Sequence, residues 1–268
     1  MSQWSNNNPA QNRAEMWLGH WNLLISLVSR DIRARYRRTV LGPLWAIIPA
    51  ILYTVILSFL SGLVGASSEG MPRLAFVMSA TVPWTFLQST VVRIPHGVLA
   101  NGTILRKMPV PRQIFPLVVL LTTCFDFLMS SIVLFVVLQI FRLPVNWTWL
   151  WLPVLFFMTG FLAWVIGIGL AALTIYRRDM LHGIQYIMQV WLFVSPVMVS
   201  SKKILADWPL LHALNPAAGI IDGFRKVLVF GEAPNFEWLL ASLALSCLLL
   251  AVAYPLYHVM SRYFADVL

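Results

Sequence analysis

Acidic side chains are scarce in this sequence. Asp and Glu together number 10 among 268 residues, and all charged residues make up only 11%. Soluble domains carry about 25% charged residues, whereas 59% of this chain is hydrophobic and its mean hydropathy is +0.78. A soluble globular domain is therefore excluded, and the composition is typical of an integral membrane protein.

The sequence also lacks the motifs of an ATPase or a metalloenzyme. No GxxxxGK[ST] loop occurs, so any ATP must be handled by a partner. The five histidines are scattered and show no HExxH spacing, and no CxxC spacing is present, so we expect no metal site. The letters GIGLAA at 167–172 match a dinucleotide fingerprint but lie in an apolar run with no strand before it. Small residues along this run instead predict a stripe for close helix packing: Gly160, Ala163, Gly167 and Ala171.

The sequence contains only two cysteines and shows no pattern of a cleavable signal peptide. Cys124 and Cys247 both lie in predicted membrane helices, so no disulfide framework is expected. Residues 1–12 are polar and lack the basic start and apolar core of a signal peptide, so we expect no leader to be removed.

Long uncharged runs are what the sequence has in abundance. A helix that crosses the roughly 30 Å hydrocarbon core needs about 20 mainly apolar residues, and open sheets would leave backbone groups unpaired in lipid. Six runs meet this length, the third of them interrupted by Asp126: 39–68, 74–92, 113–141, 143–176, 180–201 and 238–261. The predicted fold is an all-α integral membrane protein with six transmembrane helices.

Lys and Arg residues set the expected orientation, because short loops that retain positive charge stay in the cytoplasm. With a cytoplasmic N-terminus, most of the 19 Lys and Arg residues fall on inner segments. We therefore expect both termini in the cytoplasm, with 262–268 as a short tail. The net charge of +9 then reflects topology and anionic lipid, and nucleic-acid binding is not expected.

Residues 1–38 are predicted to form a cytoplasmic segment that contains an amphipathic helix at the membrane surface. Apolar residues recur at helical spacing over 17–32. Basic residues cluster on the opposite side: Arg30, Arg33 and Arg37. Arg35 falls near the apolar face and breaks the pattern. The helix is either a plain surface anchor or a docking helix that a partner can push.

The junction between this helix and the first span reads RYRRTVLGPLW, residues 35–45. Proline is tolerated in the first turn of a helix but not deep inside one. Gly42 and Pro43, followed by Trp45, therefore predict an elbow at the entrance to the first span.

Two loops are unusual. The inner loop 95–112 has room for one or two helical turns at 103–108 before its prolines end them, so it is either a basic helix projecting into the cytoplasm or a plain positive-inside loop. The outer segment 200–237 is too apolar for a free loop, yet polar and proline residues interrupt it too often for a span. Re-entrant or interfacial helices fit it best, and we expect it to form an outer gate.

Asp126 lies near the middle of the third predicted span, where an ionised carboxylate costs several kcal/mol unless it is paired or faces water. It could serve a proton relay, contact a substrate, or make an interhelical hydrogen bond with Thr122, Ser130 or a neighbouring span. We favour the hydrogen bond, because no second carboxylate is present in the predicted spans to build a relay.

The order of these features resembles a known family. The basic N-terminal helix, the LGPLW elbow, the inner loop NGTILRKMPVPR, the SPVM that ends the fifth span, the outer LNPAAGIIDGFR and the final SRYFADVL occur in this order. Together they resemble the ABC-2 type permease subunit of bacterial polysaccharide exporters, the group that handles O-antigen, capsule and teichoic acid chains. Residues 39–261 would be its transmembrane domain.

This resemblance implies a homodimer in the bacterial cytoplasmic membrane, bound to two copies of an ABC ATPase that holds ATP and Mg. A polysaccharide, possibly carried on a polyprenyl lipid, would pass between the two permeases. Residues implied to couple to the ATPase are Asn101, Leu105, Arg106, Lys107 and Arg112, with Arg33 and Arg37 on the helix beside them. Residues implied to form the outer gate are Pro196, Asn215, Pro216, Asp222 and Arg225.

Aromatic side chains of the first and fifth spans are expected by resemblance to flank the dimer axis, where rings could stack on sugar CH faces. The candidates for channel lining are Tyr53, Phe59, Trp84, Trp191 and Phe193. The alternative is an ordinary aromatic belt at the membrane surface.

Three other functions remain open from the sequence. The chain could be an ABC-2 permease for a drug or a lipid, or a proton-coupled secondary transporter that uses Asp126. A membrane-embedded glycosyltransferase is disfavoured, because no acidic or histidine cluster gathers on one side of the membrane.

Overall fold

The structure is a computed structural model that describes residues 9–37, 39–101 and 111–261, and within these ranges it contains helices and no strands. The elements in chain order are α1 (Pro9–Tyr36), η1 (Gly42–Ala46), α2 (Ile48–Leu63), α3 (Arg73–Ala100), α5 (Ile114–Ile140), η2 (Trp147–Trp151), α6 (Leu152–Tyr176), α7 (Met180–Val194), α8 (Ser201–Asp207), α9 (Pro209–Leu214), α10 (Ala218–Arg225), η3 (Lys226–Phe230) and α11 (Phe236–Ser261). The predicted all-α class is confirmed.

Five helical stretches in the described chain are long and apolar enough to cross a membrane: Gly42–Leu63, Arg73–Ala100, Ile114–Ile140, Trp147–Thr174 and Phe236–Ser261. The remaining predicted span, 180–201, is α7, which has 15 residues and is about 22 Å long. It ends at Val194 because Ser195 precedes a proline and adopts an extended backbone. The count of six spans stays a prediction.

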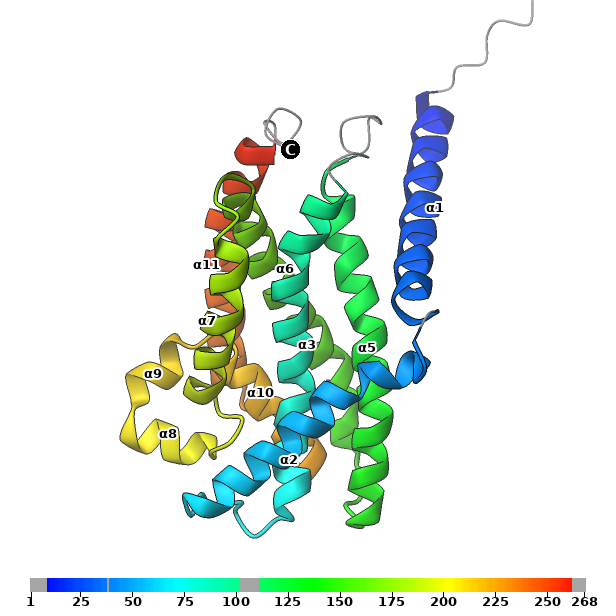
Figure 1. Cartoon of the computed structure of the whole chain (residues 1–268). Coiled ribbons are helices and arrows are strands. Elements are labelled where there is room, and N and C mark those ends of the chain that lie inside the picture. Colours follow the sequence, from blue (N-terminus) through cyan, green and yellow to red (C-terminus); the bar gives the residue numbers. More distant parts are fainter. Residues whose placement is uncertain (1–8, 38, 102–110, 262–268) are drawn as a thin grey trace, which may run out of the picture.

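Helix α3 forms the centre of the bundle, with α5 on one side and α6, α7 and α11 on the other (Figure 1). In its most apolar stretch 78% of residues are buried, against 22% for the span of η1 and α2 and 22% for α11. The C-terminal ends of α3, α6 and α11 lie at one end of the bundle, opposite α8 and the C-terminal ends of α2 and α5 (Figure 1). Segments predicted to be inner and outer are thus at opposite ends.

The predicted small-residue stripe brings α6 close to α3. Ala163 and Ala171 are fully buried, and a methyl group added to Gly167 would lie 2.5 Å from Cδ1 of Ile94. The side chain of Ile94 thus packs directly onto the backbone of Gly167, and a side chain at position 167 would force it to move. The interpretation of this run as a packing surface is therefore confirmed.

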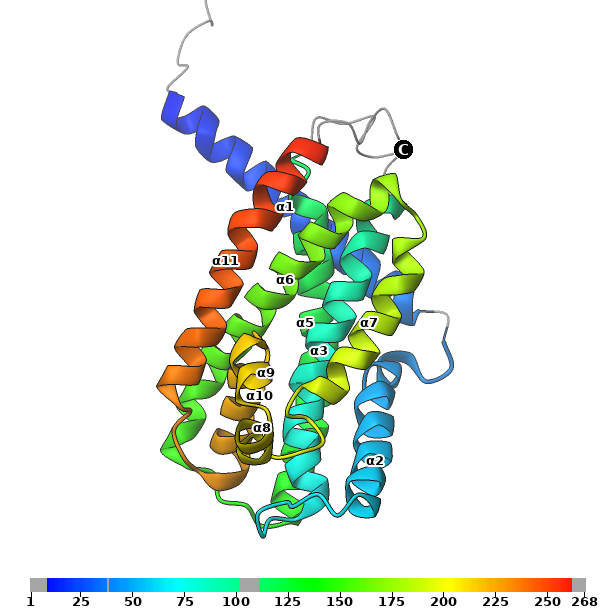
Figure 2. The same cartoon turned by 90° about the vertical axis from the view of Figure 1, so that its left-hand side faces the viewer.

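The elbow between α1 and α2 is also present. Gly42 has φ +53°, in the left-handed region that glycine adopts without strain, and Pro43 follows as the second residue of η1. The chain turns sharply here, so that α1 and α2 run in different directions (Figures 1 and 2). Trp45 is half exposed. Upstream, Leu24 and Leu27 of α1 are buried against α5.

The short helices expected in 200–237 are α8, α9 and α10, followed by the π-helical turn η3. Helices α8 and α9 lie at the edge of the bundle (Figure 1), while α10 lies against α3 and α11. Gly219 of α10 approaches the backbone of Trp238 so closely that an added methyl group would overlap its carbonyl. That α8, α9 and α10 are re-entrant or interfacial helices stays a prediction.

Candidate functional site

A polar groove of about 290 Å³ lies between α2, α3 and α7. Its residues recur at helical spacing on each helix, so each helix presents one polar face to the groove. The lining residues are Pro49, Tyr53, Thr85, Gln88, Ser89, Val92, Arg93, Gln185 and Gln189. Three glutamine amides, each with two donors and two acceptor lone pairs, make this face suited to a ligand rich in hydroxyl groups.

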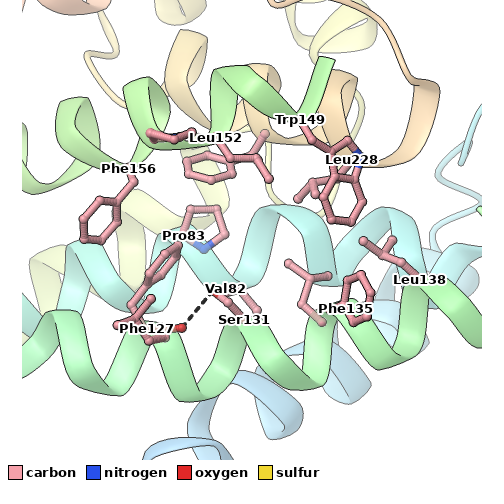
Figure 3. A pocket seen from close by; sticks show the side chains of 14 residues that line it. Val82, Pro83, Phe127, Ser131, Phe135, Leu138, Trp149, Leu152, Phe156 and Leu228 are labelled. Carbon is pink, nitrogen blue, oxygen red and sulfur yellow. Dashed lines mark hydrogen bonds between the residues drawn. The ribbon is translucent and has the colours of Figure 1, made fainter. Parts of the chain in front are cut away.

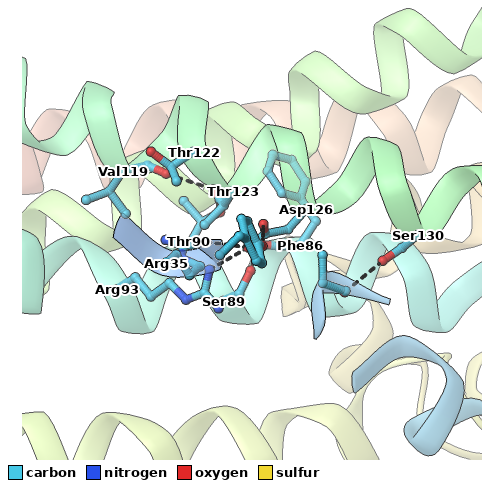
Figure 4. A network of polar contacts seen from close by, with 12 residues as sticks. Arg35, Phe86, Ser89, Thr90, Arg93, Val119, Thr122, Thr123, Asp126 and Ser130 are labelled. Atoms are coloured by element: carbon cyan, nitrogen blue, oxygen red, sulfur yellow. Dashed lines mark hydrogen bonds and ion pairs between the residues drawn. The ribbon is translucent and has the colours of Figure 1, made fainter. Parts of the chain in front are cut away.

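A second cavity of about 340 Å³ adjoins the groove and shares Pro49, Thr85, Ser89 and Arg93 with it. Its centre is the carboxylate of Asp126 on α5. Nη1 of Arg35 lies 2.6 Å and Nη1 of Arg93 2.5 Å from Oδ2 of Asp126, and the hydroxyl of Tyr36 donates to Oδ1. Figure 4 shows Arg35 and Arg93 converging on Asp126.

These contacts correct the expected partners of Asp126. A neighbouring span does bind it, through Arg93 of α3, but Thr122 and Ser130 do not: they donate to the carbonyls of Val118 and Ala46. The Arg35 that broke the amphipathic pattern of α1 is the second partner. A carboxylate held by two guanidinium groups is an ion-pair partner, so the structure gives the proton-relay alternative no support.

The aromatic residues expected to line a channel lie in different places. Tyr53 lines the polar groove, and the rings of Phe59 and Phe193 are exposed on α2 and α7. Trp84 is fully buried with its ring edge-on to Trp191, their centroids 5.5 Å apart, so in this conformation it lines no channel. Trp84 faces the hydrophobic core around α3, and its ring is therefore out of reach of a ligand.

Trp191 is held by the outer segment. Its Nε1 donates to Oδ1 of Asn215 at 3.0 Å, and Nδ2 of Asn215 donates to Oγ of Ser195 at 3.0 Å. Asn215 is buried, and its side chain therefore ties the turn before α10 to the end of α7. Pro216 follows it in that turn.

Arg225 makes the second connection between the outer segment and the bundle. Its Nη2 donates to the carbonyls of Pro196 at 2.7 Å and Val197 at 2.9 Å, and its guanidinium lies 4.0 Å from the ring centroid of Phe76. Burial lowers the pKa of Arg225 to about 10. Asp222 forms an ion pair at 3.8 Å with Lys226 one turn away. Three of the predicted gate residues, Pro196, Asn215 and Arg225, thus join the segment after α7 to α10.

A further contact at this end was not predicted. Glu69, in the loop between α2 and α3, accepts hydrogen bonds from Nζ of Lys202 at 2.5 Å and from Oγ of Ser200. Burial opposes ionisation of Glu69, but these two hydrogen bonds outweigh it and hold its pKa below the usual value. The only sequence signal was that Glu69 is the one acidic residue in this loop.

The residues implied to couple to an ATPase are only partly visible. Oδ1 of Asn101 accepts a hydrogen bond from Arg30 of α1 at 3.1 Å, which links α1 to the start of the inner loop. Nη1 of Arg112 donates to the carbonyl of Ser261, so Arg112 binds the end of α11. Arg33 and Arg37 are exposed. Leu105, Arg106 and Lys107 lie outside the described residues.

Comparison with known proteins places these features in a family. A family model described as ABC-2 type transporter matches residues 22–229. The O-antigen export system permease protein RfbA of Myxococcus xanthus is 26% identical over 91% of this chain and 94% of its own length. Two proteins of the same name from Klebsiella pneumoniae are 23% and 22% identical over 92% of this chain and 95% of their own length. The chain belongs to the ABC-2 type transporter family.

Proposed function

We propose that this chain is the transmembrane permease subunit of an ABC exporter that moves a polysaccharide, of the O-antigen or capsular type, across the bacterial inner membrane. ATP would be hydrolysed by a separate ABC ATPase. The similarity to O-antigen export permeases along almost the whole chain supports the substrate class. The observation that carries the proposal is the amide-rich groove between α2, α3 and α7.

The chemistry of the groove fits a sliding glycan. Gln88, Gln185 and Gln189 can exchange hydrogen bonds with successive sugar hydroxyls, and the ring of Tyr53 offers a face for CH groups. Groups that bind weakly and equivalently let a polymer move past, whereas a single tight site would stop it.

One chain provides only part of a conduit. The groove lies beside faces of α2 and α7 that expose large apolar side chains: Ile51, Leu52, Val55, Ile56 and Phe59 on α2, and Tyr186, Ile187, Val190 and Phe193 on α7. Pairing of two copies through these faces would enclose the two grooves between them, which supports the homodimer.

Coupling to ATP would pass through the inner loop and α1. The Arg30–Asn101 hydrogen bond connects α1 to the end of α3, and the ion pairs of Arg35 and Arg93 with Asp126 connect α1 to α3 and α5. Closure of the ATPases would thereby shift the permease between two arrangements of its spans.

A test of the groove replaces Gln88 and Gln189 with leucine together. Loss of two polar contacts at about 1 kcal/mol each predicts a fall in export of roughly tenfold or more, measured as polysaccharide at the cell surface per inserted permease. Gln139→Leu, on the exposed end of α5, is the matched control. Export by the double variant equal to that of the control would reject the groove as the path.

A second candidate, an ABC-2 permease for an apolar drug or lipid, rests on a different cavity. About 350 Å³ lies between α3, α5 and α6, lined almost wholly by apolar side chains such as Phe127, Phe135 and Phe156 (Figure 3). Stimulation of the ATPase by apolar compounds, abolished by filling this cavity with Ser131→Phe, would favour this candidate over a polysaccharide exporter.

A further inference from the structure

The cluster around Asp126 carries more positive than negative charge. Among the described residues that line its cavity, Asp126 is the one acid, while Arg35 and Arg93 are both cations. The nearest other pair on α1, Arg30 with Asp31, neutralises itself at 2.9 Å. One positive charge is therefore left over at the cavity.

The guanidinium groups also have donors to spare. Each has five N–H donors, and each directs only its Nη1 to Asp126. The hydroxyls around the cavity are already committed to backbone carbonyls: Thr39 to Tyr36, Thr85 to Val82, and Ser89 to Phe86. Arginine is thus the source of unengaged donors here, and the side chain of Arg93 is 40% exposed.

The unneutralised positive charge lies within membrane-spanning helices, where an unpaired charge is destabilising. Arg93 lies seven residues before the end of α3 at Ala100, about 10 Å along the helix, and Asp126 lies about 18 Å along α5 from its start. A cation at such depth in a membrane segment is stabilised by a counter-ion. Two guanidinium groups side by side match the oxygen geometry of a phosphate group.

The walls of the cavity indicate what carries that phosphate. Phe86, Phe127 and Trp45 line it together with the arginines. The adjoining elbow exposes apolar side chains, Val40 fully and Leu41 and Leu44 by about half. An apolar surface next to a phosphate site suits a molecule that has acyl chains below its phosphate, which inorganic phosphate does not.

We propose that the cavity between α1, the elbow, α3 and α5 binds the phosphate group of a membrane lipid, with Arg35 and Arg93 as its ligands. Asp126 is a positioning residue that holds both guanidinium groups toward the cavity. The lipid would hold α1 against the spans at the point where coupling motion enters them. This cavity adjoins the glycan groove and shares Arg93 and Ser89 with it, but Arg35 and Asp126 line the cavity and not the groove. The proposal does not depend on which substrate is exported.

The test is native mass spectrometry of the purified permease complex titrated with phosphatidylglycerol, or with diacylglycerol of the same chains. We expect phosphatidylglycerol to be retained and diacylglycerol not. Arg93→Gln should weaken retention on the order of tenfold, the loss of one hydrogen bond to a charged group, while the exposed Arg178→Gln should leave it unchanged. Equal retention by wild type and Arg93→Gln would overturn the proposal.

Two additional measurements keep the result interpretable. Ser89→Leu fills the cavity without removing either arginine, so it should also release the lipid, and normal lipid retention in a folded Ser89→Leu protein would contradict the site. Displacement of phosphatidylglycerol by millimolar inorganic phosphate alone would show that the cavity takes free phosphate and would overturn the lipid assignment.

Discussion

At the scale of single residues, Asp126 and Arg225 are the buried charges among the residues that the structure describes, and they are stabilised in opposite ways. Asp126 is bound by two guanidinium groups and a tyrosine hydroxyl. Arg225 has no carboxylate in direct contact among the described residues and is satisfied instead by backbone carbonyls and the ring of Phe76. Removing Arg225 would leave the backbone carbonyls that it binds with fewer donors, and a buried acceptor left unsatisfied costs about 1–3 kcal/mol. The partners of Asp126 are partly exposed, so its removal should cost less.

His212 gives the residue-scale prediction. It is buried edge-on to Trp238 at a centroid distance of 4.5 Å, and neither ring nitrogen has a hydrogen-bond partner among the described residues. Burial lowers the pKa of His212 below its usual 6.5, against the opposing influence of Asp222. At pH values below about 6.5, His212 is protonated more in the unfolded chain than in the folded one. The free energy of unfolding therefore decreases as the pH falls.

The check compares melting temperatures at pH 7.5 and pH 5.5. Wild type should lose more on acidification than His212→Phe, which keeps an aromatic ring against Trp238 but cannot be protonated. His258→Phe serves as a second histidine replacement for comparison. An identical pH response in wild type and His212→Phe would show that His212 does not contribute.

Residue-scale contacts were also the hardest to predict. That Asp126 needed an interhelical partner followed from the cost of a buried carboxylate. Its partners Arg35 and Arg93 could not be named, because nothing local to residue 126 encodes which distant side chain lies opposite. The useful signals were an arginine on the apolar face of α1 and an arginine that ended the second predicted run.

At the scale of the elements, helix boundaries follow from backbone chemistry more than from hydropathy. The apolar run after residue 180 continues to 201, yet α7 stops at Val194 before Pro196. Conversely, α3 continues past the polar residues after 92 to Ala100, because Pro95 sits inside the helix rather than ending it. Hydropathy predicted which segments are helices, but it did not predict the residues at which α3 and α7 end.

The contact of α6 with α3 gives the element-scale prediction. Gly167→Ala places a methyl group 2.5 Å from Cδ1 of Ile94, which must move, and overpacking of this kind costs about 1–3 kcal/mol. Gly167→Val should cost more. Gly183→Ala on α7, where no atom lies within 4 Å, is the control and should be neutral or stabilising. Thermal unfolding measures all three, and a Gly167→Val protein as stable as the control would contradict the packing.

At the scale of the whole molecule, the chain is a helix bundle with different polar contacts at its two ends. One end holds the Arg30–Asn101 contact and the anchoring of Arg112 on α11, where an ATPase would act. The other end holds α8, α9 and α10, tied down through Glu69, Asn215 and Arg225. The groove between α2, α3 and α7 lies along the bundle between them. Under the proposed function, an ATPase would act at the first end and the gate would lie at the second.

The most direct test of this account is purification of the tagged chain in mild detergent, with identification of accompanying proteins, their stoichiometry, and an ATPase assay. The account predicts a second protein that contains a phosphate-binding loop, present in two copies for every two permeases, with ATPase activity in the eluate. A preparation that exports polysaccharide in reconstituted vesicles and contains no such ATPase would contradict the account.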